Sequence, residues 1–297
     1  MSSAPESVEQ VRALLAGQNY IAGDRLSTSV FLALSLNRPL FLEGEAGVGK
    51  TELAVALASA LERRLIRLQC HEGLDLAGAA YEWNHARQIL AIRLAEAEGR
   101  KSVAGLSADL YSREFLIERP LLKALSVYLE GPPVLLVDEL DRADEPFEAY
   151  LLEFLADFRI SIPEHGEVEA ARPPLVVLTS NRTREVHDAL KRRCLYCWVD
   201  YPSQAAEERI LAARAPGLPE ALRARVVGFV QALRQEGLFK APGVSETLDW
   251  AEALLAMDAR EVDTQAVSET LGALLKYQED FEKLNENAVE RLLAAGG

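Results

Sequence analysis

The sequence predicts an α/β core, in which helices flank a parallel sheet, followed by an all-α C-terminal lid domain. Two observations lead to this fold class. Up to about residue 202, short apolar runs typical of buried strands alternate with segments of helical periodicity. From Pro202 onward the sequence has no strand-like run, and apolar residues keep helical spacing. We therefore expect a core at residues 1–202 and a helical lid at residues 203–297, with the boundary where the pattern changes.

Residues 44–51 form a complete phosphate-loop motif, G-x-x-x-x-G-K-[ST]. They are Gly44, Glu45, Ala46, Gly47, Val48, Gly49, Lys50 and Thr51. The apolar run at 39–43 predicts a strand before the motif, and leucines at helical spacing predict a helix over 51–61. This order of strand, loop and helix is the context that the motif requires. The alternative is a glycine-rich turn that caps an ordinary helix.

The residue types of this motif suit a nucleoside triphosphate. Glycines let backbone N–H groups surround phosphates at the positive end of a helix. Lys50 can reach the β- and γ-phosphates, and the Thr51 hydroxyl can ligate Mg²⁺. We therefore expect ATP and Mg²⁺ to bind at this loop.

Two carboxylates, Asp138 and Glu139, end the aliphatic run that starts at Val134. In an open parallel sheet such a strand end lies at the carboxyl edge, beside the phosphate loop. Asp138 could hold Mg²⁺ and Glu139 could orient the attacking water. The alternative is a pair of acids that only caps a strand.

Asn181 follows another apolar run, which begins at Leu175, and offers an amide to the γ-phosphate or the water. Asparagine also favours the turns that end strands, so this reading competes with a structural one. Arg192 and Arg193 end a predicted helix and precede a predicted strand. They either complement the helix C-terminus or act as an arginine finger that stabilises charge on a γ-phosphate.

Composition limits the classes of function. Hydrophobic residues make up 49% of the chain, no apolar stretch reaches the length of a membrane span, and the polar start lacks a signal sequence, so we expect a cytoplasmic protein. The net charge of −14 argues against a broad nucleic-acid footprint and favours protein partners. Cys194 and Cys197 have C-x-x-C spacing but no second pair, so we interpret them as packing residues, with redox or metal chemistry as the alternative.

The remaining patterns complete the predicted fold. A strand is expected at 65–70, and a hairpin joins 158–162 to 167–170. Helices are expected near 86–97, 121–129 and 146–154 in the core, and at 206–214, 219–234, 246–257 and 265–277 in the lid. The group Tyr81-Glu82-Trp83-Asn84 is either a surface that contacts a partner or a set of buried aromatics.

With these motifs assembled, residues 20–260 resemble the MoxR family of AAA+ ATPases. Residues 44–51 match the family's Walker A, 134–139 its Walker B, and 179–181 its sensor 1. The hairpin at 158–170 falls at the pre-sensor-1 hairpin, and 190–193 at the arginine-finger segment. Within the family, residues 67–75, 81–84 and 179–196 are most similar to the CoxD type, which assists maturation of molybdenum-containing carbon monoxide dehydrogenase.

The resemblance implies an AAA+ P-loop NTPase core and hydrolysis of ATP to ADP and phosphate. It implies a homo-oligomeric ring, usually a hexamer, in which Arg193, or else Arg192, reaches the ATP of a neighbouring subunit. It also implies a chaperone-like role with a von Willebrand factor A domain protein and a client metalloenzyme. The alternatives are a slow nucleotide-dependent assembly switch and, against the acidic balance, a nucleic-acid motor.

The lid departs from the family pattern at one position. Many relatives carry a sensor-2 arginine in a Ser-Pro-Arg element, whereas here the corresponding stretch is Gly243-Val244-Ser245-Glu246-Thr247, with Thr247 at the arginine position. Either another cation, such as Lys240, replaces that arginine, or hydrolysis depends more on the finger from the neighbouring subunit.

Overall fold

The computed structural model describes residues 5–97 and 110–296. Part of the polar start on which the expected cytoplasmic location depends, residues 1–4, lies outside the described residues. Within the described chain, none of the helices is both long enough and apolar enough to cross a bilayer.

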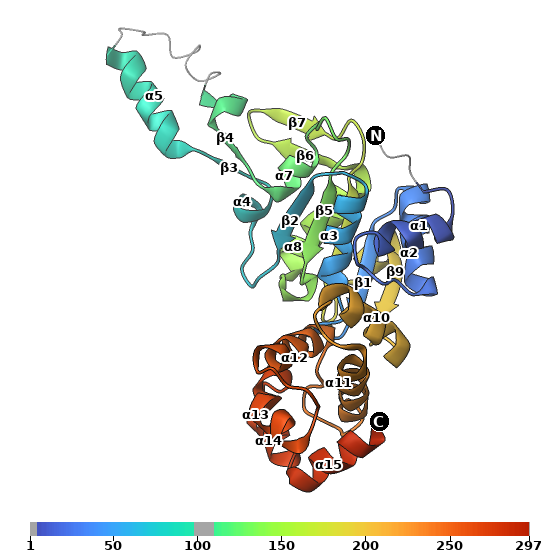
Figure 1. The fold of residues 1–297 in the computed structure, drawn as a ribbon. Helices are drawn as coiled ribbons and strands as arrows, with labels where there is room; N and C mark the ends of the chain where they lie inside the picture. Colours follow the sequence, from blue (N-terminus) through green and yellow to red (C-terminus); the bar gives the residue numbers. More distant parts are fainter. Residues whose placement is uncertain (1–4, 98–109, 297) are drawn as a thin grey trace.

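Five parallel strands form the central sheet, in the order β2-β5-β8-β1-β9 (Figure 1). They are β1 (Leu40–Gly44), β2 (Leu65–Gln69), β5 (Val134–Asp138), β8 (Leu175–Ser180) and β9 (Leu195–Val199). Each forms at an apolar run that the sequence predicts as a strand. The predicted fold class, a parallel sheet with flanking helices and a helical C-terminal region, is confirmed.

Helices cover both faces of the sheet, because alternate strand residues point to opposite sides. Leu40 and Leu42 belong to one buried cluster, and Phe41 between them belongs to the other. The first face carries α1 (Val8–Ala16), α2 (Asp24–Leu36) and α3 (Lys50–Ala60). The second carries α7 (Pro120–Ala124), the short 3₁₀ turn η2 (Leu140–Arg142), α8 (Glu145–Asp157) and α9 (Asp188–Arg193).

The helices of the core differ from the expected ones in two ways. The helix predicted over 121–129 ends at Ala124, and Val127 and Leu129 beyond it are 83% and 100% exposed. Apolar residues two apart cannot share one helix face, so these side chains give a longer helix no packing partner. The sequence reading also missed α1 and α2, although Ser7 caps α1 by accepting a hydrogen bond from the backbone of Gln10.

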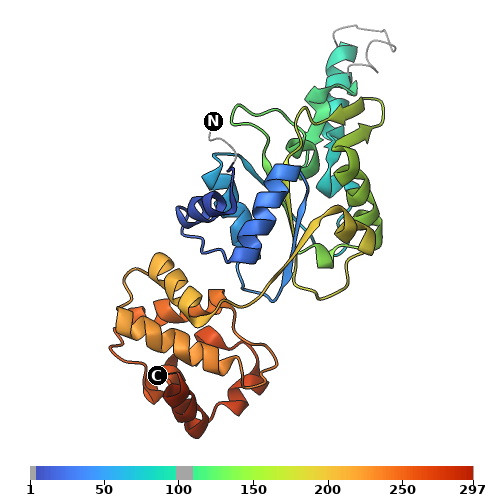
Figure 2. The same cartoon turned by 90° about the vertical axis from the view of Figure 1, so that its right-hand side faces the viewer.

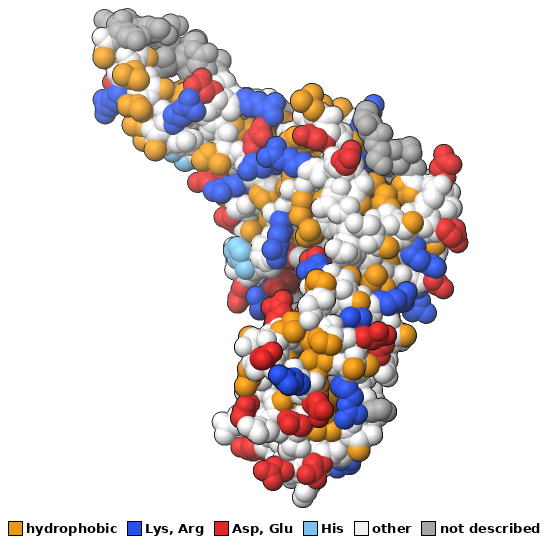
Figure 3. All heavy atoms as spheres, in the orientation of Figure 1, with side chains coloured by type: hydrophobic (Ala, Val, Ile, Leu, Met, Phe, Trp, Pro, Cys, Tyr) orange, Lys and Arg blue, Asp and Glu red, His pale blue; other side chains and the backbone are white. Residues whose placement is uncertain are grey.

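An arm leaves the core between β2 and β5 and carries α5 away from the sheet (Figures 1 and 2). Its elements are α4 (Leu76–Ala79), β3 (Tyr81–Trp83), α5 (His85–Ala97), η1 (Arg113–Phe115) and β4 (Leu116–Glu118). The aromatic group forms β3, paired with β4, and both aromatic side chains are partly buried against the core. Apolar side chains of the arm lie on its surface (Figure 3), among them Ile89, Leu90 and Leu94.

The predicted hairpin is confirmed, because β6 (Arg159–Ile162) and β7 (Gly166–Glu169) pair antiparallel. Its turn lies against the arm. The His165 ring is 6.4 Å from the Trp83 ring, and its Nδ1 is 3.2 Å from the carbonyl of Tyr111.

The C-terminal part is a bundle of helices with its own buried core around Trp250 and Phe229. The helices are α10 (Gln204–Arg214), α11 (Glu220–Leu233), α12 (Val244–Ala256), α13 (Thr264–Leu274), α14 (Gln278–Lys283) and α15 (Glu286–Ala295). The last two were not predicted. A boundary at Pro202 remains our proposal, supported by this separate core.

Candidate nucleotide-binding site

A cavity of about 370 Å³ opens between the carboxyl edge of the sheet and the lid. Its walls come from the phosphate loop, the ends of β5 and β8, the α1–α2 connection and the lid helices. Residues outside the predicted motifs that line it are Asn19, Tyr20, Ile21, Glu52, Ile210, Arg214, Val244, Ser245 and Leu248.

The phosphate loop has the backbone that only glycine adopts readily. Gly47 and Gly49 have φ values of +76° and +92°, in the left-handed region. The side chain of Lys50 folds over the loop, with Nζ donating to the carbonyls of Gly44 at 2.8 Å and Glu45 at 2.6 Å. Burial lowers the pKa of Lys50 to about 8. The loop therefore presents a cation beside the free amides at the start of α3, which suits a phosphate group.

Asp138 is buried and accepts hydrogen bonds from three side chains. Its Oδ1 accepts from the hydroxyls of Thr51 at 2.8 Å and Thr179 at 2.6 Å, and its Oδ2 accepts from Arg67 at 2.6 Å. The two residues expected to hold Mg²⁺ are thus in direct contact. A hydroxyl and a carboxylate are hard oxygen ligands that suit this ion, with nucleotide phosphates completing its shell.

Glu139 lines the cavity with an unusual backbone, φ 54° and ψ 50°. Its carboxylate lies 3.3 Å from Arg142, and its backbone N–H donates to the Thr179 hydroxyl at 2.9 Å. Thr179 thus connects both acids, because the same hydroxyl donates to Asp138. This threonine lies in the predicted sensor-1 segment, but its bridging role depends on the pairing of β5 with β8.

Asn181 also lines the cavity, and its backbone N–H donates to Asp141 Oδ1 at 3.1 Å. Thr183 donates to Oδ2 of the same carboxylate through its backbone, at 2.9 Å, and its hydroxyl, at 2.6 Å. Burial alone would raise the pKa of Asp141, but the hydrogen bonds from Thr183 and Asn181 lower it below its ordinary value. Asp141 therefore fixes the backbone that presents Asn181.

Arg192 and Arg193 lie outside this cavity. Both are exposed in the last turn of α9, and neither lines the cavity of its own chain. Arg38 donates to their carbonyls at 2.9 and 3.3 Å. The end of α9 therefore has its own cationic partner, which leaves the two guanidinium groups available for another contact.

The lid cation at the cavity differs from the residue that the sequence suggests. Thr247 is fully buried, and Lys240 is absent from the cavity wall, with its backbone N–H donating to Asp280. Arg214 lines the cavity instead and pairs with Glu52 at the start of α3. No local pattern indicates this contact, because it joins residues from the core and the lid.

None of the three cysteines lines the cavity, although the backbone N–H of Cys70 donates to the carbonyl of Asp138 at 2.9 Å. Cys70, Cys194 and Cys197 are free and buried, and burial raises the pKa of the first two to about 12. Such thiols remain protonated near neutral pH and are poor nucleophiles. Across residues 5–97 and 110–296, His, Cys, Asp and Glu side chains form no group of three that could hold a metal ion.

Comparison with known families identifies the core. Residues 39–194 match the AAA domain of the dynein-related subfamily. The chain belongs to this AAA subfamily. The matched range includes the phosphate loop, both acids and Asn181.

Relatives of this AAA protein match about two thirds of the chain at low identity. An uncharacterized protein of Staphylococcus saprophyticus is 27% identical over 195 residues, which span 63% of this chain and 65% of that protein. Another from Staphylococcus haemolyticus is 24% identical over 209 residues, 67% of this chain and 70% of that protein. A solved RuvB variant from Thermotoga maritima covers 96% of this chain and 76% of its own, with 15% identity and a TM-score of 0.51, which supports the fold alone.

The sequence reading assigned no individual role to four residues of the AAA site. Thr179 and Asp141 fix the backbones of Glu139 and Asn181, as described above, while Arg67 and Arg214 supply cations at the Walker-B acid and the lid. Thr179 had a signal as part of the predicted sensor-1 segment, and Asp141 had a weak one, an acid two residues after Glu139.

Proposed function

We propose that this AAA protein hydrolyses ATP to ADP and phosphate with Mg²⁺. The observation that carries the proposal is the gathering of Lys50, Thr51, Asp138 and Glu139 around one cavity. Metal-assisted hydrolysis of a phosphoanhydride requires a phosphate cradle, a metal site and a group that orients water. A protein that only bound nucleotide would not need an acid in the place of Glu139.

Each residue has a role in this proposal. The amides of residues 44–51 and the Lys50 ammonium bind the phosphates, and Thr51 with Asp138 holds Mg²⁺. Glu139 accepts a hydrogen bond from the attacking water, and Asn181 orients the water or the γ-phosphate. In this arrangement the pair between Glu139 and Arg142 opens when nucleotide binds.

Arg193, with Arg192 as second choice, acts as the finger for the site of a neighbouring subunit. Its support is that both arginines are exposed and lie outside the cavity of their own chain. Such a finger requires a closed homo-oligomeric ring, for which we propose a hexamer.

We further propose a MoxR-type role of the CoxD kind. The protein would act in the cytoplasm with a von Willebrand factor A domain partner and remodel a molybdenum enzyme during assembly of its metal centre. The sequence stretches at 67–75, 81–84 and 179–196 support this choice. The net charge of −14 disfavours a nucleic-acid substrate.

The test is the mass of the Glu139→Gln protein by light scattering, with and without Mg-ATP. The proposal expects growth from monomer or dimer to a ring when ATP is added, and a ring trapped in this way can then be used to capture the partner. Arg193→Ala in the same background should bind ATP but assemble less. A protein that binds ATP and stays monomeric would favour a nucleotide switch over a remodelling ring.

A further inference from the structure

A buried ion pair lies in the lid behind the phosphate loop. Glu207 of α10 is fully buried, and the side chain of Arg234, at the end of α11, is 4% exposed. The guanidinium makes two parallel hydrogen bonds to the carboxylate, of 2.6 and 2.7 Å. Such a two-pronged arrangement fixes geometry as well as charge.

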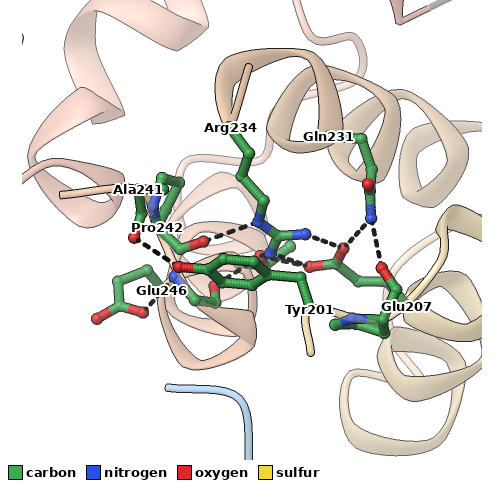
Figure 4. Close-up of polar contacts among 10 residues, drawn as sticks. Tyr201, Glu207, Gln231, Arg234, Ala241, Pro242 and Glu246 are labelled. Carbon is green, nitrogen blue, oxygen red and sulfur yellow. Dashed lines mark hydrogen bonds and ion pairs between the residues drawn. The ribbon is translucent and has the colours of Figure 1, made fainter. Parts of the chain in front are cut away.

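The pair is joined to the connection between core and lid. The guanidinium carbon of Arg234 lies 4.6 Å from the centre of the Tyr201 ring. Gln231 donates to Glu207 at 2.7 Å and to the carbonyl of Pro202 at 3.0 Å. Figure 4 shows Arg234 extending from its helix toward the carboxylate, with the Tyr201 ring beside it. The last residues before α10 are therefore tied to the same cluster.

The pair also holds the segment that leads into α12. Arg234 Nε donates to the carbonyl of Pro242 at 2.8 Å, and the Thr247 hydroxyl donates to Glu207 at 2.8 Å (Figure 4 shows the Pro242 contact). Thr247 occupies the position where related lids carry an arginine. Here Thr247 is part of the buried cluster around Glu207, and the guanidinium group beside it belongs to Arg234 at the end of α11.

This segment rests on the phosphate loop itself. The backbone N–H groups of Val244 and Ser245 donate to the carbonyl of Gly47, at 2.9 and 3.3 Å. Amides in the first turn of a helix have no partner within the helix, so Gly47 satisfies donors that α12 leaves open. The backbones are close, because a Cβ on Gly243 would lie 2.7 Å from the carbonyl oxygen of Ala46 and 2.8 Å from the Cα of Gly47.

We propose that Glu207 and Arg234 are positioning residues that hold the start of α12 against the phosphate loop. The lid then senses the nucleotide through main-chain contacts at Gly47 and does not need a sensor-2 arginine. This inference deepens the proposed function and rests on nucleotide binding at the loop. It follows that weakening this contact lowers nucleotide affinity without unfolding the lid.

The first test is Gly243→Ala, with Gly272→Ala as the matched control. Alanine fits the backbone of Gly243, φ −81° and ψ −175°, but its methyl group pushes the lid off the loop. A Cβ on Gly272, in α13, meets open space. We expect Gly243→Ala to raise the Kd of a fluorescent ADP analogue about tenfold, the scale of a lost pair of hydrogen bonds. Gly272→Ala should bind like wild type.

Hydrogen exchange of Val244 and Ser245 in the nucleotide-free protein reports the contact directly. These amides should exchange about tenfold faster in Gly243→Ala than in wild type. If wild type binds ADP and Gly243→Ala binds it equally well, the inference is overturned. Equal exchange rates of these amides in the two proteins would also overturn it. If wild type binds no nucleotide, the proposed function fails, whereas the exchange difference still decides whether the lid rests on the loop.

The second test separates positioning from stability. Either single change at the pair leaves a buried charge without its partner and destabilises the lid, whereas the double variant Glu207→Leu, Arg234→Met removes both charges. We expect the double variant to unfold close to wild type in urea but to retain a weaker ADP affinity. Wild-type ADP affinity in the double variant would overturn the positioning role of the pair.

Discussion

Thr179→Val isolates the hydroxyl that connects the two acids of the site. Valine has nearly the same shape as threonine, so the change removes hydrogen bonds and leaves little cavity. Thr179 is buried, and its hydroxyl donates to Asp138 at 2.6 Å while accepting from the backbone of Glu139 at 2.9 Å. The variant thus loses one charge-assisted hydrogen bond and leaves one N–H without a partner.

The magnitude follows from these two losses. A hydrogen bond to a charged group contributes about 1.5–3 kcal/mol, and an unpaired buried donor costs about 1–3 kcal/mol. Together they should lower the free energy of unfolding by about 2.5–6 kcal/mol. Glu139 would also leave its left-handed conformation, which costs about 1–3 kcal/mol to hold, so turnover should fall about 100-fold. Nucleotide affinity should change little, because the Lys50 ammonium is held by the carbonyls of Gly44 and Glu45.

The assay is phosphate release at saturating Mg-ATP, with ADP binding and urea unfolding measured on the same protein. Thr179→Ser keeps the hydroxyl and should retain most of the activity. A valine variant with wild-type turnover would refute the bridging role of this residue.

Three further predictions concern the loop and the lid. Phosphate binding needs protonated Lys50, whose pKa is about 8, so ADP affinity should fall as pH rises above 8, and Lys50→Met should remove that dependence in a binding titration. Without nucleotide, the free energy of unfolding should rise between pH 8 and 10.5, because in that range the unfolded chain holds a proton on Lys50 that the folded chain has lost. Arg214→Gln should change ADP affinity by no more than about fivefold, because its pair with Glu52 is 40% and 42% exposed; a larger change would give Arg214 a direct ligand contact. Trp250→Phe removes a buried hydrogen bond of 2.7 Å to Thr270 and should lower lid stability in urea by about 2–4 kcal/mol, so an unchanged midpoint would contradict the packing described.

The centre of the sheet was predictable because β1, β5 and β8 are buried on both faces and have nearly continuous apolar runs. The edge strands β2 and β9 are only partly buried, and their place in a parallel sheet follows from the alternation of strands with helical segments. The arm was not predictable in the same way. β3 and β4 have three residues each, too few for any periodicity, and they pair across more than thirty positions of sequence.

The candidate site likewise has a part that the sequence predicts and a part that only the fold creates. The phosphate loop and the acids at 138–139 are local motifs, so the sequence identifies them without knowledge of the fold. The contact of Thr179 with Asp138 depends on which strand lies beside β5, and that of Gly47 with Val244 depends on how the lid meets the core. Neither depends on a local pattern, because both arise from long-range packing.

The central claim is that Glu139 activates water for hydrolysis of ATP bound at the phosphate loop. The most direct measurement is phosphate release by wild type and Glu139→Gln at saturating Mg-ATP, with ATP binding measured for both. We predict equal binding and at least a ~100-fold slower release in the variant, the usual scale for a lost general base. Equal phosphate release from the two proteins, or no ATP binding by wild type, would contradict the account.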